Sequence, residues 1–228
     1  MVLFYCKHWT TENAFLTEEE SHHCTRVLRK RVGDIVHCTD GKGTLIKGEI
    51  TVLDKKELQL SIIQSEFEEI TKHKLHLVTA PTKNISRMEW LVEKCTEIGI
   101  HEFSFVFTKN TERKKLRVDR LEKIAMSATK QSLRRYLPSI HLHATVPTFL
   151  STLSGKEEKF ICHFDPQNPD LVQQEWGSES LIFIGPEGDF TKEELTMCLD
   201  HGFKACNLSK KRLRTETAAI VATTIFNS

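Results

Sequence analysis

The feature that most constrains the fold is a strand–loop–helix unit that occurs twice in the last fifth of the chain. Residues 181–184 (LIFI) form a short apolar run typical of a strand buried on both faces, and Gly-Pro-Glu-Gly at 185–188 ends it. A capping box at Thr191–Glu194 predicts a helix directly after this loop. The unit then repeats as a strand over 204–208, a polar loop over 209–216 and a helix rich in Ala, Ile and Val. Two such units predict neighbouring loops at the carboxyl ends of parallel strands, where open α/β sheets bind ligands.

Strands and helices also alternate upstream of this unit. Apolar runs predict strands over 75–80, 103–107, 140–144 and 160–164. Amphipathic patterns predict helices over 85–98 and 118–133, and a short helix after Pro147. In the helix after residue 191, Leu195, Cys198 and Leu199 should form the apolar stripe. This alternation predicts an α/β domain with a parallel sheet.

The first part of the chain has a different pattern. Strands are predicted over 2–5, 35–39, 45–53 and 58–64, with turns at 40–43 and 54–56. A capping box at Thr17–Glu20 predicts one basic helix, with Cys24, Val27 and Leu28 on its buried face. Short antiparallel strands with a single helix predict a small β-barrel.

Residues 66–74 lack apolar periodicity, so we expect a linker there. The chain should therefore divide into a barrel domain over 1–72 and an α/β domain over 73–228. At 228 residues, the chain is long enough for two small domains.

Composition and cysteine usage limit the class of protein. The formal net charge is +1, which by itself indicates no polyanionic partner. Seven cysteines without a C-x-x-C pair indicate reduced thiols, and no set of residues has the spacing of a metal site. The start of the chain (MVLFYCKHW) lacks the apolar length of a signal peptide, and no apolar run approaches the ~18 residues of a membrane span. We therefore expect a cytoplasmic protein with no membrane segment and no metal.

Four separated motifs resemble one known family. IGPEGDFTKEEL and LSKKRLRTETAAI are similar to the paired signatures of the SPOUT superfamily, specifically of the family that methylates uridine N3 in small-subunit ribosomal RNA. The segment from Lys83 to Gly99 resembles the first helix of that family's catalytic domain, and HHCTRVLRKRVGDIVHCTDGKG (22–43) resembles its RNA domain. Three positions depart from the family pattern: Asp189 replaces a third glycine, Lys210 replaces a glycine, and Lys130 replaces a common glutamate.

The resemblance implies a fold, a cofactor and partners. The fold is a SPOUT-type parallel sheet with a C-terminal trefoil knot, preceded by a PUA-like or OB-like β-barrel. The cofactor is S-adenosylmethionine, the substrate is ribosomal RNA within an assembled small subunit, and the protein is a homodimer. We expect cofactor binding by the two loops and one preceding strand end, through His163, Ile184, Gly185, Pro186, Glu187, Gly188, Leu208, Leu213, Arg214 and Thr215.

The residue types in these loops suit that ligand. Gly185 and Gly188 allow a positive φ and a close approach of flat adenine to bare backbone amides, while Pro186 stiffens the turn. Leu208 and Leu213 can cover the faces of the base. A plain βα connection without a ligand remains the alternative for the Gly-Pro loop taken alone.

Methylation at N3 requires removal of a proton and stabilisation of the resulting anion. From their positions in the loops, Glu187 or Glu216 can accept the proton, and Arg214 can donate to the developing oxyanion. Alternatively, Glu216 is simply a favourable charge at the start of a helix.

Basic residues are concentrated in one segment. Between residues 109 and 135 there are ten lysines and arginines against three acidic residues, which indicates either a phosphate-binding surface or an ordinary solvated face. The expected RNA contacts are Arg26, Arg29, Arg87, Arg113, Lys114, Lys115, Arg134 and Arg135.

Three other functions remain open from the sequence. The fold could serve a methyltransferase acting on ribose 2′-oxygen or on transfer RNA. It could be a non-catalytic RNA-binding factor, or the GPEGDFT loop could bind a nucleotide phosphate. The last reading lacks the lysine and further glycines of a P-loop.

Overall fold

The computed structural model describes residues 1–54, 57–70 and 73–228, and the chain forms two compact units. The first unit contains Met1–Ile70 and Ser127–Leu137, and the second contains the described residues that follow Ile70 up to Met126, together with Pro138–Ser228. The predicted domain boundary between residues 72 and 73 falls beside 71–72, which lie outside the described residues. Residues 127–137 were predicted to lie in the second domain but belong to the first unit.

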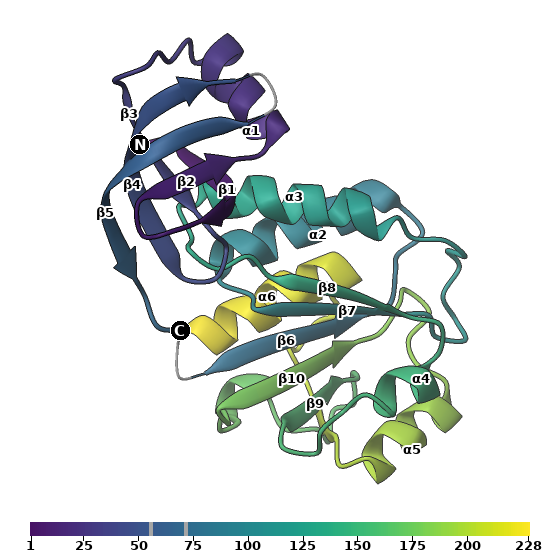
Figure 1. The fold of residues 1–228 in the computed structure, drawn as a ribbon. Helices are drawn as coiled ribbons and strands as arrows, with labels where there is room; N and C mark the ends of the chain where they lie inside the picture. The colour runs from purple at the N-terminus through teal and green to yellow at the C-terminus, as the bar shows by residue number, and fades with distance from the viewer. Residues whose placement is uncertain (55–56, 71–72) are drawn as a thin grey trace. The chain divides into compact units, whose positions relative to one another are not determined.

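The first unit is a closed five-stranded barrel in the order β1-β2-β5-β4-β3 (Figure 1). The parallel pairing of β1 with β3 closes it, whereas the other neighbouring strands are antiparallel. Its strands are β1 (Leu3–Trp9), β2 (Asn13–Leu16), β3 (Ile35–Thr39), β4 (Thr44–Leu53) and β5 (Leu58–Phe67). The predicted barrel is confirmed, β2 was not predicted, and the predicted linker is wrong in its first part because β5 continues to Phe67. Lys55 and Lys56 of the predicted turn lie outside the described residues.

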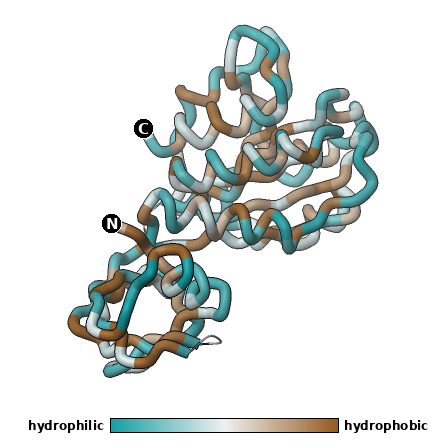
Figure 2. Tube along the Cα trace, turned by 90° about the horizontal axis from the view of Figure 1, so that it is seen from above, coloured by the Kyte–Doolittle hydropathy of each residue, from teal (hydrophilic) through white to brown (hydrophobic). Residues whose placement is uncertain are grey.

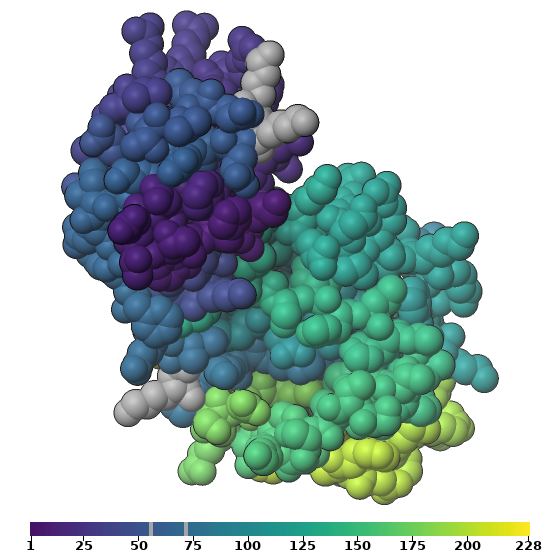
Figure 3. Space-filling model, in the orientation of Figure 1, coloured from purple at the N-terminus to yellow at the C-terminus, as the bar shows by residue number. Residues whose placement is uncertain are grey.

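Alternation of side chains builds the barrel core. In β4, Ile46, Gly48 and Ile50 are buried and Glu49 is exposed. Figure 2 shows hydrophobic and hydrophilic stretches interspersed along the trace. Gly48 sits where a side chain would not fit, since a Cβ there would lie 2.9 Å from Leu60 Cβ. Side chains cover the outside of the barrel strands on the face shown in Figure 3.

The helix of the first unit is shorter and wider than predicted. Thr17 caps α1 (Glu18–His22) by accepting from Glu20 N, and the helix continues as a π-helical turn, η1 (His23–Val27). Cys24 is buried and Leu28 packs on the barrel core, but Val27 is 61% exposed, so its predicted burial is wrong. The wider π turn explains the error, because it rotates the following residues away from the period of 3.6.

The second unit contains a six-stranded sheet in which every neighbouring pair is parallel, as predicted, with the order β11-β9-β10-β6-β7-β8. Its strands are β6 (Lys74–Thr79), β7 (Glu102–Val106), β8 (Ser139–His143), β9 (Glu158–Cys162), β10 (Glu179–Ile184) and β11 (Lys204–Cys206). Its helices are α2 (Ile85–Ile98), α4 (Val146–Leu150), α5 (Lys192–Asp200), α6 (Thr215–Asn227) and the 3-10 turn η2 (Leu171–Gln173). Helix α3 (Val118–Gln131) begins in this unit and ends in the first.

Helices cover both faces of the sheet. Leu181 and Phe183 of β10 join a cluster with α4 and α5 that includes Phe149 and Cys198. Helices α2 and α6 pack on each other, and α6 also packs on β6 and β10; Figure 1 shows them across the sheet from α4 and α5. Leu199 of α5 is 42% exposed, so its predicted place in the apolar stripe is wrong.

The C-terminal segment returns to the middle of the sheet after β11, which lies at one edge. Helix α6 then lies against α2, β6 and β10, elements that precede β11 in the sequence. The family resemblance implies a C-terminal trefoil knot, in which the last helix packs back against earlier parts of the chain. Helix α6 has this placement. Among the described residues, no helix is long and apolar enough to cross a membrane.

Candidate cofactor cavity

A cavity of about 480 Å³ lies where the neighbouring strands β9, β10 and β11 end. Three loops line it, together with the first turns of α6: residues 162–164, 184–189, 206–209, 211–215 and 218. Every residue predicted to bind the cofactor, from His163 to Thr215, is among them. The carboxyl ends of parallel strands thus bring together loops that are far apart in the sequence.

The glycines of the loop after β10 are required for space. Neither Gly185 nor Gly188 has a positive φ, so that part of the prediction is wrong. A Cβ on Gly185 would lie 3.1 Å from Phe190 Cε2, and one on Gly188 would lie 3.1 Å from Asn110 Cβ. The backbone approaches its neighbours closely at both positions, which only glycine permits without displacement.

Asp189 adopts the left-handed conformation that a glycine would adopt easily, with φ at 59°. Its carboxylate accepts from Phe190 N at 2.8 Å and pairs with His163 Nδ1 at 3.0 Å. These contacts give a physical account of the departure from the family's third glycine, because aspartate tolerates this region when its side chain bonds locally. They also place His163 in the cavity wall.

Two contacts hold the loop after β11. Thr215 Oγ1 donates to the main-chain oxygen of Gly185 at 2.9 Å and so joins the two signature loops. Asn207 is 9% exposed, and its amide donates to the main-chain oxygens of Asp165 and Asn168 at 2.7 and 3.0 Å. Asn207 was not predicted from the sequence, because its partners lie in a loop with no recognisable pattern.

Two cysteines also line the cavity and were not predicted to do so. Cys162 and Cys206 are register partners on β9 and β11, with their Sγ atoms 3.8 Å apart. The contact with Cys206 and burial raise the pKa of the Cys162 thiol well above its usual value. This thiol therefore stays protonated at neutral pH and is a poor nucleophile.

The three candidate catalytic residues do not lie together. Glu187 and Arg214 are exposed and line the cavity. Glu187 accepts from Lys83 N at 3.2 Å. Glu216 is 7% exposed, is absent from the lining, and pairs with Arg87 Nε at 3.4 Å. Arg87, predicted as an RNA contact, is thus an ion-pair partner within the fold.

The basic residues of the second unit have mixed environments. Arg113 Nε donates to the main-chain oxygen of Thr82 at 3.0 Å, which ties the loop after β7 to the loop after β6. Lys114 and Lys115 are exposed, and Lys114 Nζ also donates to Thr111 O at 3.3 Å. Lys109 and Lys123 of the same segment are exposed as well.

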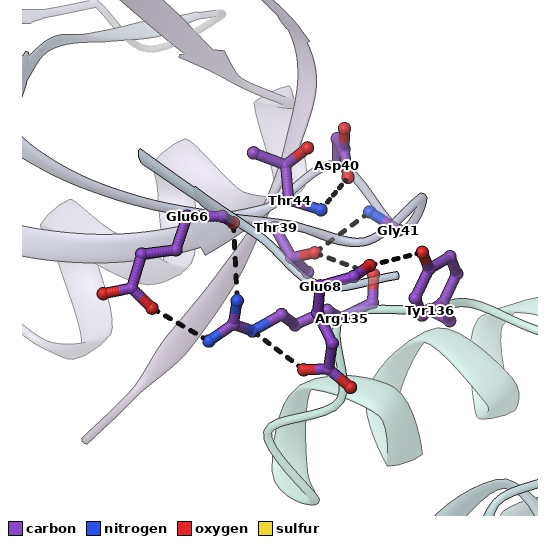
Figure 4. Close-up of polar contacts among 8 residues, drawn as sticks. All are labelled: Thr39, Asp40, Gly41, Thr44, Glu66, Glu68, Arg135 and Tyr136. Atoms are coloured by element: carbon purple, nitrogen blue, oxygen red, sulfur yellow. Dashed lines mark hydrogen bonds and ion pairs between the residues drawn. The ribbon is translucent and has the colours of Figure 1, made fainter. Parts of the chain in front are cut away.

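In the first unit, Arg26 and Arg29 are exposed, whereas Arg135 is engaged within the unit. Arg135 pairs with Glu66 at 3.0 Å and with Glu68 at 3.3 Å, beside the hydrogen bond from Tyr136 to Glu68 O (Figure 4). These contacts fasten segment 132–137 to the barrel.

Burial affects two further basic residues of this unit. It lowers the pKa of Arg134, predicted as a phosphate contact. Lys130 stands where the family commonly has a glutamate, and it forms an ion pair with the buried Glu20. Glu20 was predicted from the sequence to cap a helix, but its carboxylate is the partner of Lys130. Across residues 1–54, 57–70 and 73–228, no group of three or more His, Cys, Asp or Glu residues could hold a metal ion.

Comparison with known proteins identifies the family of this chain. A family model described as an RNA methyltransferase domain matches residues 69–227, and one described as an RNA methyltransferase PUA domain matches residues 16–63. The chain is 28% identical to Ribosomal RNA small subunit methyltransferase E of Buchnera aphidicola, over 94% of this chain and 87% of that protein.

Two solved structures are similar over nearly the whole chain. A probable rRNA-methyltransferase from Porphyromonas gingivalis is 34% identical, with a TM-score of 0.89 and coverage of 98% of this chain and 95% of that one. Ribosomal RNA small subunit methyltransferase E from Neisseria gonorrhoeae, bound to S-adenosyl methionine, is 25% identical, with a TM-score of 0.87 and the same coverage. The resemblance and the fold inferred from the motifs are confirmed. Because the methyltransferase model matches more than half of its residues, this chain belongs to the RNA methyltransferase family.

Proposed function

We propose that this protein uses S-adenosylmethionine to methylate N3 of one uridine in 16S ribosomal RNA. The observation that carries the proposal is the cavity at the ends of β9, β10 and β11, built from both signature loops. The names of the relatives support it, since two of those described above are called small-subunit ribosomal RNA methyltransferases, and one of these was solved with S-adenosyl methionine bound.

The cavity fits this cofactor in size and lining. Its volume of about 480 Å³ lies within the ~300–1,000 Å³ of small-molecule sites. Loop backbone at 184–188 offers amides and carbonyls to the edges of adenine, and the half-buried Leu208 and Leu213 offer apolar surface to its faces. When bound, the cofactor supplies an electrophilic methyl group on a sulfonium sulfur.

In the proposed reaction, the N3 proton of uridine passes to a carboxylate of this chain. The electron pair left on N3 forms the new bond to the methyl carbon, while the carbon–sulfur bond breaks and its electrons stay on sulfur. Glu187 is the better proton acceptor, because it lines the cavity, whereas Glu216 is buried against Arg87. Arg214 lines the same cavity, where its guanidinium can stabilise the oxygen that becomes negative.

The remaining parts of the function follow from the same proposal. Arg26, Arg29, Lys114 and Lys115 are exposed and bind RNA phosphates. The substrate is the assembled small subunit in the cytoplasm, and the enzyme acts as a homodimer. The functional domains are 1–72 and 73–228 along the sequence, with residues 127–137 packed in the first compact unit.

The test is mass spectrometry of 16S ribosomal RNA from a strain in which the gene is deleted. One methylated uridine should be lost on deletion and restored by the wild-type gene. Restoration by Glu216→Gln but not by Glu187→Gln is expected if Glu187 accepts the proton. An unchanged set of methylated nucleotides in the deletion strain would refute the proposed function, and full restoration by Glu187→Gln would refute only its catalytic role.

A further inference from the structure

The loop after β7 contacts the cavity loop directly. Asn110 Nδ2 donates to the main-chain oxygens of Gly188 and Asp189, each at 3.0 Å. One residue earlier, Lys109 N donates to Glu194 Oε1 at 2.7 Å, while the other oxygen of Glu194 accepts from Thr191 N at the start of α5. One short segment therefore contacts both the cavity loop and the start of the following helix.

The cavity loop has a particular need for this support. Asp189 holds a left-handed conformation that favours glycine, so its carbonyl keeps its direction only if neighbouring contacts fix it. Asn110 bonds this carbonyl and the preceding one with a single amide. The Asp189 carboxylate also pairs with His163, which lines the cavity.

The approach of Asn110 also accounts for Gly188. A Cβ on Gly188 would lie 3.1 Å from Asn110 Cβ and 3.6 Å from Asn110 Cγ. The backbone at this position thus lies directly against the asparagine side chain. The contact brings residues from separate parts of the sequence together, which is why neither signature loop reveals it.

We propose that Asn110 is a positioning residue for cofactor binding. Its amide fixes the main chain at Gly188 and Asp189, and through Asp189 it holds His163 in the cavity wall. The inference rests on the proposed function in one respect, namely that the cavity takes S-adenosylmethionine.

The test compares Asn110→Ala and Asn110→Asp with the wild type. Both variants lose the two donated hydrogen bonds, and the second retains the shape of asparagine while placing a carboxylate against two carbonyl oxygens. Lys109→Ala is the matched control, because it changes a side chain of the same segment but keeps the main-chain bond to Glu194. Titration calorimetry with S-adenosylmethionine should show affinity about 5–20-fold weaker for Asn110→Ala, weaker still for Asn110→Asp, and within about 2-fold of wild type for Lys109→Ala.

Two further measurements separate positioning from a general loss of structure. In steady-state assays on small subunits from the deletion strain, Asn110→Ala should raise KM for the cofactor and leave KM for the subunit unchanged. Hydrogen exchange should become faster in the peptide over 185–190 and stay unchanged in β6 and α2. Equal affinity and equal exchange in Asn110→Ala and wild type would overturn the inference. If the wild type itself binds no S-adenosylmethionine, the proposed function fails, and unchanged exchange over 185–190 would still refute the role of Asn110.

Discussion

Replacing Thr215 by valine removes the contact that joins the two signature loops while keeping the shape of the side chain. Thr215 is 4% exposed, and its hydroxyl donates to the main-chain oxygen of Gly185 at 2.9 Å. The substitution leaves this buried oxygen without that donor, and an unsatisfied buried polar group costs about 1–3 kcal/mol. We therefore expect Thr215→Val to lower the free energy of unfolding by about 2 kcal/mol, which shifts Tm by roughly 4–8 °C in a chain of this size.

Urea unfolding followed by circular dichroism measures this change. The matched control is Thr224→Val, since Thr224 lies in the same helix, is exposed, and donates to Ile220 O within that helix at 2.9 Å. The control should stay within about 0.5 kcal/mol of wild type. If Thr215→Val were as stable as Thr224→Val, the bond to Gly185 would contribute nothing and the reasoning would be refuted.

Three other predictions concern packing, pH and RNA. Gly185→Ala should weaken cofactor binding at least about 10-fold in calorimetry, because the new methyl group would meet Phe190 at 3.1 Å and displace the loop; affinity equal to wild type would show that the loop yields without cost. Burial lowers the pKa of His76 to about 3, so the unfolded chain binds a proton here below pH ~6.5 while the folded chain does not. Stability should therefore fall as the pH drops, by about 2 kcal/mol at pH 5 relative to pH 7, and urea unfolding should show a smaller fall in His76→Gln. Substituting Lys114 and Lys115 by alanine should reduce the slope of log affinity for RNA against log salt by about 1–2 in filter binding, and an unchanged slope would assign both lysines to a solvated face.

The repeated strand–loop–helix unit could be predicted because local patterns determine it. The apolar run of β10 is buried at every position from Ser180 to Ile184, and the capping box of Thr191 and Glu194 is formed as its spacing indicates. Parallel pairing then places the predicted loops at one edge of the sheet, which is why all predicted cofactor residues line one cavity.

Contacts between distant residues could not be predicted in the same way. Glu20 has the spacing of a capping residue but pairs with Lys130, and Glu216 has the position of a helix-start charge but pairs with Arg87. Asn110 lies outside every motif, since its partners are main-chain oxygens of another loop. Local geometry explains other wrong predictions. Val27 was predicted to be buried, but the π-helical turn leaves it exposed.

The return of α6 to the centre of the sheet determines when the cavity comes into existence. The walls of the cavity come from three strand ends and from the start of the last helix. Folding must therefore complete the contacts of α6 with elements far away in the sequence before a ligand has a place to bind. A ligand that binds only the completed cavity stabilises the whole unit by mass action. The rise of Tm with S-adenosylmethionine concentration would therefore report the affinity of the ligand for chains whose last helix has reached its native position.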